Sequence, residues 1–242
     1  MTDAETLAPA GLPETAALGW RREPASARTL RRDGRRWTAW TCWVVALFTA
    51  PGLVLLWIEP LTFPAAALCF THAWAVPSLQ ARRGARSVVP IGSERSAGSG
   101  GPAGRAALGL LGDLVGHDER DLLTRSGLAL QRGRMGTWLV GEQGAFLVLP
   151  PRRLRGRRVF CWCVRVGDAA GLPAGDRVAH LLLALREDEE GFATVANLAF
   201  SGARWRVLWH LEAPTRAALT AAQTGERGAT RRPAVLPGRS VA

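Results

Sequence analysis

Two long hydrophobic segments without charged residues, residues 37–58 and 61–79, dominate the hydropathy pattern of the first third of the chain. Glu59 and Pro60 separate them. As α-helices the segments would be ~33 Å and ~28 Å long at 1.5 Å per residue, and a bilayer has a hydrocarbon core of ~30 Å. We therefore predict a transmembrane helical hairpin over residues 37–79. A buried hairpin in a soluble protein is the less favoured alternative, because charge-free runs of this length are rare in soluble cores.

Arginines flank this hairpin on both sides. Those before it are Arg31, Arg32, Arg35 and Arg36, and those after it are Arg82, Arg83 and Arg86. The turn between the two segments carries only an acidic residue, Glu59. Because positively charged flanks stay on the cytoplasmic side, we predict a two-pass protein of the inner (plasma) membrane with both termini in the cytoplasm.

The pattern changes after the hairpin. Residues 80–104 are polar and contain a Gly/Ser-rich run, which predicts a flexible linker. Residues 105–222 combine helical spacing of apolar residues with short strand-like runs, which predicts a small cytoplasmic α+β domain with an antiparallel sheet and flanking helices. The runs expected to be strands are 128–130, 137–140, 145–149 and 159–166. We predict that residues 1–36 and 223–242 are disordered.

Composition narrows the function classes. The net charge is +11, and all 31 basic residues are arginine. Without lysine the chain cannot use a Schiff-base lysine or a P-loop lysine. A GxGxxA arrangement at Gly98, Gly100 and Ala103 lacks a preceding strand, so we predict no nucleotide cofactor. Four cysteines, two of them inside the hairpin, fit a reducing cytoplasm, and the arginine-, alanine- and glycine-rich composition suggests a bacterial source.

The most unusual feature of the expected domain is an arginine-rich loop between two expected strands. Its basic residues are Arg152, Arg153, Arg155, Arg157 and Arg158. An anion would relieve their mutual repulsion, and the candidates are anionic lipid headgroups or nucleic-acid phosphates. The loop contains no aromatic residue that could stack on bases, so nucleic acid is the weaker alternative. A solvated hairpin loop is the plainest interpretation.

Two further groups of residues could carry chemistry. Asp113, His117 and Asp121 are spaced by four and, with Glu142, could form an acid/base or metal site, although a solvated helix face explains the spacing equally well. Cys161 and Cys163 alternate on an expected strand, so that both thiols would lie on one face. Zinc is a weak possibility for this pair, because a structural site normally uses four ligands.

The second hydrophobic segment contains one ionisable group, His72, with Cys69 one turn before it. An ionisable residue inside a membrane segment often has a functional role, so His72 is a candidate functional residue. Packing or pairing of the helices explains a histidine at this position equally well. The chain contains no GxSxG, HExxH or Walker A pattern. We therefore expect an interaction or regulatory module at the inner membrane face rather than an enzyme, with the bilayer and another membrane or cytoplasmic protein as its partners. Anionic-lipid binding, nucleic-acid binding and an unrecognised enzymatic site remain as alternatives.

Overall fold

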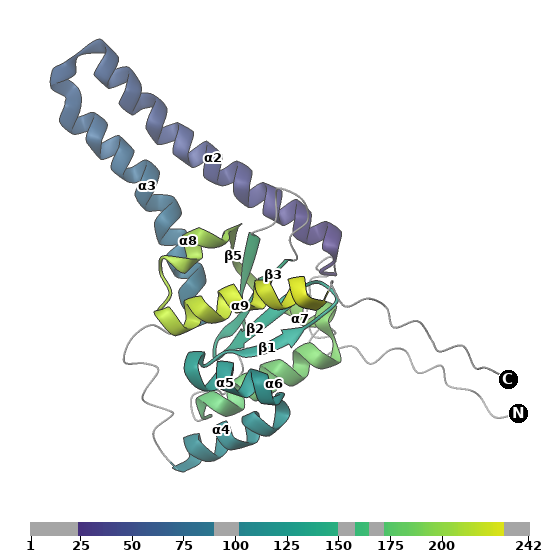
Figure 1. The fold of residues 1–242 in the computed structure, drawn as a ribbon. Coiled ribbons are helices and arrows are strands. Elements are labelled where there is room, and N and C mark those ends of the chain that lie inside the picture. The colour runs from purple at the N-terminus through teal and green to yellow at the C-terminus, as the bar shows by residue number, and fades with distance from the viewer. Residues whose placement is uncertain (1–23, 90–101, 150–157, 165–171, 230–242) are drawn as a thin grey trace, which may run out of the picture.

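The structure, a computed structural model, describes residues 24–89, 102–149, 158–164 and 172–229, and it describes no side chains at 117–118 and 223–229. A long helical hairpin projects from an α+β domain (Figure 1). The hairpin consists of α2 (Ala27–Ile58), the short 3₁₀-helix η1 (Pro60–Thr62) and α3 (Phe63–Arg86).

The domain is built around one antiparallel sheet whose strands are arranged in chain order. The strands are β1 (Ala129–Arg132), β2 (Thr137–Gly141), β3 (Gly144–Val148), β4 (Arg158–Cys163) and β5 (Asn197–Ala203). A two-residue turn joins β2 and β3, because Gly141 pairs directly with Gly144. The register of β4 against β5 shifts between Cys161 and Trp162, which marks a β-bulge.

Helices cover both faces of the sheet. One face packs on α4 (Pro102–Leu114), α6 (Ala174–Glu187) and α7 (Glu189–Val195), with Trp138, Phe160 and Leu182 at its centre. The other packs on α8 (Arg204–Leu208), α9 (Ala213–Ala229) and the end of α3, with Phe146 and Phe200 fully buried. The helix α5 (His117–Ser126) lies beside β1 and α9. The domain thus has two apolar cores, one on each side of the sheet.

The predicted α+β class and antiparallel sheet are confirmed. The expected strands at 128–130, 137–140 and 145–149 correspond to β1, β2 and β3, and the apolar run 159–166 contains the interior strand β4. Alternating side chains of β4 enter the two cores, which explains why almost every position in this strand is apolar.

Several predicted boundaries are wrong because the hairpin helices continue into the domain. The helix α3 extends to Arg86, and Ala81, Ala85, Val88 and Val89 are buried, so residues 80–89 are not a flexible linker. The helix α2 begins at Ala27 behind a capping box formed by Ser26 and Thr29, so residues 27–36 are not disordered. The domain helices also extend further than expected, from Pro102 to Ala229. The remainder of the predicted linker and tails lies outside the described residues.

Within the described part of the chain, one helix, α2, is long and apolar enough to cross a membrane. The second predicted span, residues 61–79, is helical but is not confirmed as a span. His72, Ser78 and Gln80 lower the hydropathy of α3. Only 11 % of the most apolar window of α2 is buried, so this helix is not the core helix of the domain.

Candidate functional site

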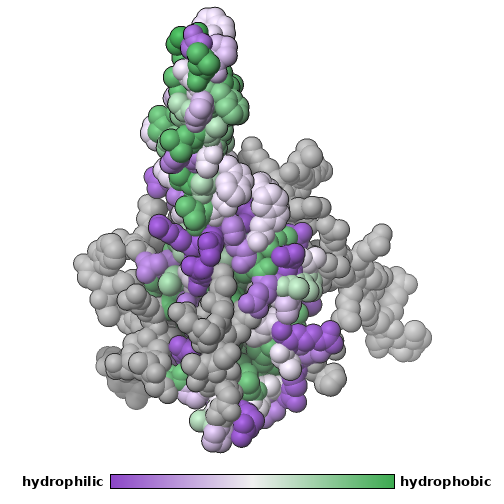
Figure 2. All heavy atoms as spheres, turned by 90° about the vertical axis from the view of Figure 1, so that its left-hand side faces the viewer, coloured by the Kyte–Doolittle hydropathy of each residue, from purple (hydrophilic) through white to green (hydrophobic). Residues whose placement is uncertain are grey.

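The outer part of the hairpin exposes many large apolar side chains, which appear in green among paler and purple residues (Figure 2). Large hydrophobic side chains exposed there by at least half are Trp43, Leu53, Val54, Trp57, Ile58, Leu61, Phe63, Leu68, Trp74 and Leu79. They come from both helices and from the turn between them. An apolar surface of this extent on a soluble monomer marks contact with a partner or a membrane.

Small residues bring the two hairpin helices together. Gly52, Ala66 and Ala73 are buried between α2 and α3. A Cβ atom at Gly52 would lie 2.9 Å from Cε1 of Phe70 and 3.2 Å from Cβ of Cys69, so the close approach requires glycine here. The larger apolar side chains therefore point outward, which is how membrane helix pairs are commonly built.

Charge is segregated along the hairpin. Residues 37–58 and 60–81 contain no Asp, Glu, Lys or Arg, and His72 is their one ionisable imidazole, whereas Arg35, Arg36, Arg82 and Arg83 are exposed at the end that joins the domain. Glu59 lies at the opposite end, in the turn. The length of the hairpin thus lacks charged residues, and its arginines are concentrated at the end that joins the domain.

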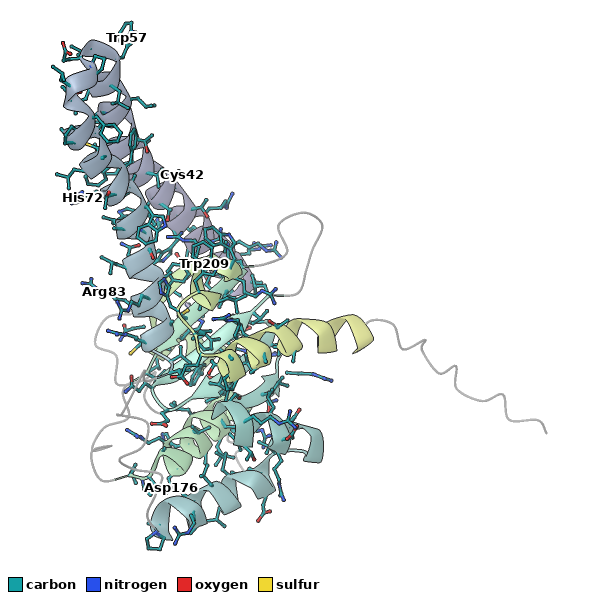
Figure 3. All side chains as sticks on the ribbon, turned by 60° about the vertical axis from the view of Figure 1, so that its left-hand side comes forward. Cys42, Trp57, His72, Arg83, Asp176 and Trp209 are labelled. Carbon is teal, nitrogen blue, oxygen red and sulfur yellow. The ribbon has the colours of Figure 1, made fainter. Side chains whose placement is uncertain are left out.

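Tryptophans mark the two ends of the hairpin. Trp57 is 87 % exposed at the tip, and Trp40 is exposed near the base, where its ring contacts that of Trp37 at 6.5 Å (Figure 3 shows Trp57). The 17 residues from Trp40 to Trp57 correspond to a rise of ~26 Å along an α-helix. That rise is close to the thickness of a hydrocarbon core, at whose boundaries indole rings accumulate.

The base of the hairpin is fixed to the strands β4 and β5 by specific contacts. The guanidinium group of Arg158 on β4 donates to the backbone oxygen of Gly34 at 2.6 Å and to Oγ of Ser201 at 3.1 Å, and it also bonds Oγ1 of Thr38. The ring of Trp37 packs edge to face against that of Phe200, with ring centres 5.7 Å apart. The hairpin and the domain therefore form one packed unit at their junction.

Arg158 is the one member of the predicted anion-binding loop that the structure describes. Its guanidinium is bonded to α2 and β5, which makes Arg158 a contact between the hairpin and the sheet. Arg152, Arg153, Arg155 and Arg157 lie outside the described residues. The anion-binding prediction for these four stays a prediction.

Three of the four candidate acid/base residues have described side chains, and each of these three pairs with an arginine. Asp113 on α4 and Asp121 on α5 are largely exposed and pair with Arg120 and Arg125, respectively, each at 2.9 Å. Glu142 lies in the β2–β3 turn, largely buried, and accepts from Arg177 at 3.0 Å. The backbone of His117 begins α5, and its side chain is outside the described part of the chain.

The two cysteines of β4 differ in environment. Cys161 is fully buried beside Gly84 and Phe200, and burial raises the pKa of its thiol well above the ordinary value. Cys163 is partly exposed at the end of the strand. No cluster of three or more His, Cys, Asp or Glu side chains able to hold a metal occurs among the described residues. Cys161 is a core residue of the hairpin-facing side of the sheet.

His72 is exposed on α3 and stacks on Phe48 of α2 with ring centres 5.5 Å apart (Figure 3). Its Nδ1 lies 2.8 Å from the backbone oxygen of Leu68, one turn earlier. Cys69 is partly buried against Gly52. Both residues thus have packing roles within the hairpin.

Sequence reasoning missed two features of the domain. A cavity of about 440 Å³ lies between α4, α5 and α6 and is mainly apolar, with Arg120 and Glu142 on its wall. The buried carboxylate of Glu189 accepts from Nε1 of Trp138 at 2.6 Å and from the backbone of Arg134 and Met135. Its position in the acidic run 187–190 gave no signal that one member is buried, because the partners are more than 50 residues away.

Comparison of the chain with protein-family models, with curated proteins and with solved structures finds no match. The function is therefore inferred from the geometry of the hairpin and of its junction with the sheet.

Proposed function

We propose that this chain is a membrane-anchored protein whose helical hairpin inserts into the bilayer and holds the α+β domain at the cytoplasmic face of the membrane. The observation that carries the proposal is the exposed, uncharged, apolar surface of the hairpin above a base of arginines. Burying this surface in hydrocarbon removes it from water, which is favourable by roughly 25 cal/mol per Å². The domain acts as an interaction or regulatory module.

The polar side chains of the hairpin support insertion of both helices. In α3, Oγ1 of Thr71 donates to the oxygen of Ala67 at 2.8 Å, and His72 bonds Leu68 in the same way. In α2, Oγ1 of Thr41 donates to the oxygen of Trp37. Polar groups within a bilayer need internal partners, and these bonds reduce the cost of placing α3 beside α2 in hydrocarbon.

The arginines support the proposed orientation. Arg35 and Arg36 on α2 and Arg82 and Arg83 on α3 are at the same end of the hairpin as the domain. Cationic flanks stay on the cytoplasmic side. The proposal is therefore a two-pass anchor with its turn on the outer side and the domain in the cytoplasm.

Insertion is tested by fractionating cells that express the full chain. We expect it to sediment with membranes and to resist alkaline carbonate. A variant with one arginine on each hairpin helix, Leu53→Arg with Leu68→Arg, is expected to lose this resistance. The matched control, Leu110→Arg with Leu183→Arg, places the same charges at comparably exposed apolar positions of α4 and α6 and is expected to stay in the membrane. Release of the unmodified chain by carbonate would overturn the proposal.

Orientation is tested by cysteine labelling in intact cells with a membrane-impermeant maleimide. Leu61→Cys, 86 % exposed at the turn, is expected to react from outside. Leu110→Cys on the domain is expected to react only after permeabilisation. The reverse result would place the domain outside the cytoplasm and refute the orientation.

A further inference from the structure

The short helix α8 exposes two large aromatic side chains beside the hairpin. Trp205 is 55 % exposed and Trp209 is 65 % exposed, and their rings contact each other edge to face with centres 5.2 Å apart. Figure 3 shows Trp209 at the level where the hairpin meets the domain. A pair of exposed indoles on a domain that has buried its other large aromatic rings indicates a contact surface.

Polar contacts hold α8 against α3 at a defined height. Nη2 of Arg206 donates to the backbone oxygen of Pro77 at 2.6 Å. Immediately after α8, Nε2 of His210 lies 3.3 Å from Oγ of Ser78. Pro77 precedes Arg82 by five residues, or ~8 Å along an α-helix. The two contacts thus attach α8 to the last turns of the uncharged part of α3, just before its arginines begin.

The surroundings of α8 combine indoles with cations. Arg82 and Arg83 are exposed on α3, and burial, followed by the positive charge of Arg82, lowers the pKa of His210. Trp40 of α2 is exposed near the same end of the hairpin. Aromatic side chains at the level of the headgroups, next to arginines that face anionic lipid, are the usual composition of a protein surface at a membrane boundary.

We propose that α8 is a second membrane contact, in which Trp205 and Trp209 enter the headgroup layer of the leaflet from which the hairpin emerges. We argue that the occupant of this surface is lipid because α8 packs directly on α3, at the boundary between its uncharged segment and its arginines. This inference rests on the proposed insertion of the hairpin. It deepens that proposal, since a second contact would fix the height and tilt of the packed hairpin and domain relative to the membrane surface.

The test measures the lipid exposure of single positions in the full chain, reconstituted in vesicles of phosphatidylcholine and phosphatidylglycerol. Cys42, Cys69 and Cys163 are replaced by alanine, while the buried Cys161 is retained. A fluorophore is then placed at Trp209→Cys and, in a separate protein, at Trp205→Cys. Quenching is measured with lipids that carry a nitroxide near the headgroup end of the acyl chain, and with iodide in the water.

Two further positions serve as controls. Leu53→Cys reports insertion of the hairpin, and Leu110→Cys, as exposed as Trp209, reports a domain surface on α4 at the far end of the molecule from the hairpin (Figure 1). We expect nitroxide lipid to quench the probes at positions 53, 205 and 209, and iodide to quench the probe at position 110.

The outcomes separate this inference from the proposed function. Quenching by lipid at position 53 but by iodide at positions 205 and 209 would overturn the α8 contact and leave the anchor intact. Protection of positions 205 and 209 from both quenchers would show that a second copy of the chain covers α8, and would also overturn the contact. Absence of lipid quenching at position 53 would refute insertion itself.

Discussion

The guanidinium group of Arg158, at the start of β4, donates a hydrogen bond to the backbone oxygen of Gly34, in the middle of the basic part of α2, at 2.6 Å. The two residues are 124 positions apart in the chain. The absence of a side chain at Gly34 permits this contact, because a Cβ atom there would lie 3.1 Å from Cδ of Arg158. The bond joins the hairpin directly to an interior strand of the sheet.

Removing this guanidinium is expected to loosen the hairpin on the domain. Arg158→Met retains much of the aliphatic length of the side chain but loses the bonds to Gly34, Thr38 and Ser201. A hydrogen bond to a buried charged group contributes about 1.5–3 kcal/mol. Because Arg158 is partly exposed, we expect its bonds together to contribute about that much, measured as a loss in the free energy of unfolding by denaturant titration in detergent.

The control for that experiment is Arg125→Met, which removes an exposed i,i+4 ion pair with Asp121 on α5. Exposed pairs of this kind contribute about 0.2–1 kcal/mol, so this variant should remain close to the unmodified protein. Equal effects of the two substitutions would show that Arg158 does not hold the hairpin.

Two helical glycines provide a matched pair. A Cβ atom at Gly84 in α3 would collide with Cβ of Phe200, whereas a Cβ atom at Gly109 in α4 has no heavy atom within 4 Å. We expect Gly84→Ala to lower the free energy of unfolding by about 1–3 kcal/mol through overpacking. We expect Gly109→Ala to be neutral or to raise it by up to about 1 kcal/mol, because alanine favours helix. A neutral Gly84→Ala would contradict the close seating of α3 on β5.

The buried carboxylate of Glu189 gives a third prediction. Both of its oxygens accept hydrogen bonds, one from Nε1 of Trp138 and the backbone of Met135, the other from the backbone of Arg134. Glu189→Gln replaces one acceptor by an NH₂ group that faces a donor. An unsatisfied buried group costs about 1–3 kcal/mol, which we expect as lost stability in urea unfolding. Glu190→Gln, the exposed neighbour, should change little, and a similar loss there would count against this role of Glu189.

Local patterns in the sequence were sufficient to predict the strands β1 to β4. Their apolar runs are separated by short glycine-containing turns, and the pairing of Gly141 with Gly144 is set by only four residues. Local patterns do not separate the strand β5 from the short helix α8, because the two follow each other directly in the chain. The strand β5 forms because it pairs with β4, and α8 is held in place by its contact with Pro77. Both contacts are with parts of the chain that are distant in sequence.

The same limit explains the errors at the hairpin base. Arginines at 82, 83 and 86 made residues 80–89 resemble a polar linker, although Ala81, Ala85 and Val88 already carry a helical spacing of small apolar residues. The sequence likewise gives no sign of the contact between Arg158 and Gly34, because the two residues are remote in sequence. An arginine-rich stretch is normally interpreted as a solvent-exposed surface. Only the fold shows which of its arginines bonds to another part of the protein.

The last prediction concerns pH and the contact between α8 and α3. Burial, and secondarily the positive charge of Arg82, lower the pKa of His210 below its ordinary value, while its bond to Ser78 acts weakly in the opposite direction. The unfolded chain therefore binds a proton at His210 at a higher pH than the folded chain does. Stability should then fall as the pH decreases below about 6.5, and the loss should continue until the folded protein is protonated as well.

We expect the free energy of unfolding of the unmodified protein to decrease between about pH 7.5 and about pH 5.5, on either side of the ordinary histidine pKa. His210→Gln, which cannot titrate, should show a shallower decrease. His180→Gln, at an exposed position on α6, is the control and should retain the full dependence. If His210→Gln and the unmodified protein have the same slope, the imidazole is protonated equally in the folded and unfolded chains, and α8 is held on α3 by Arg206 without a contribution from neutral His210.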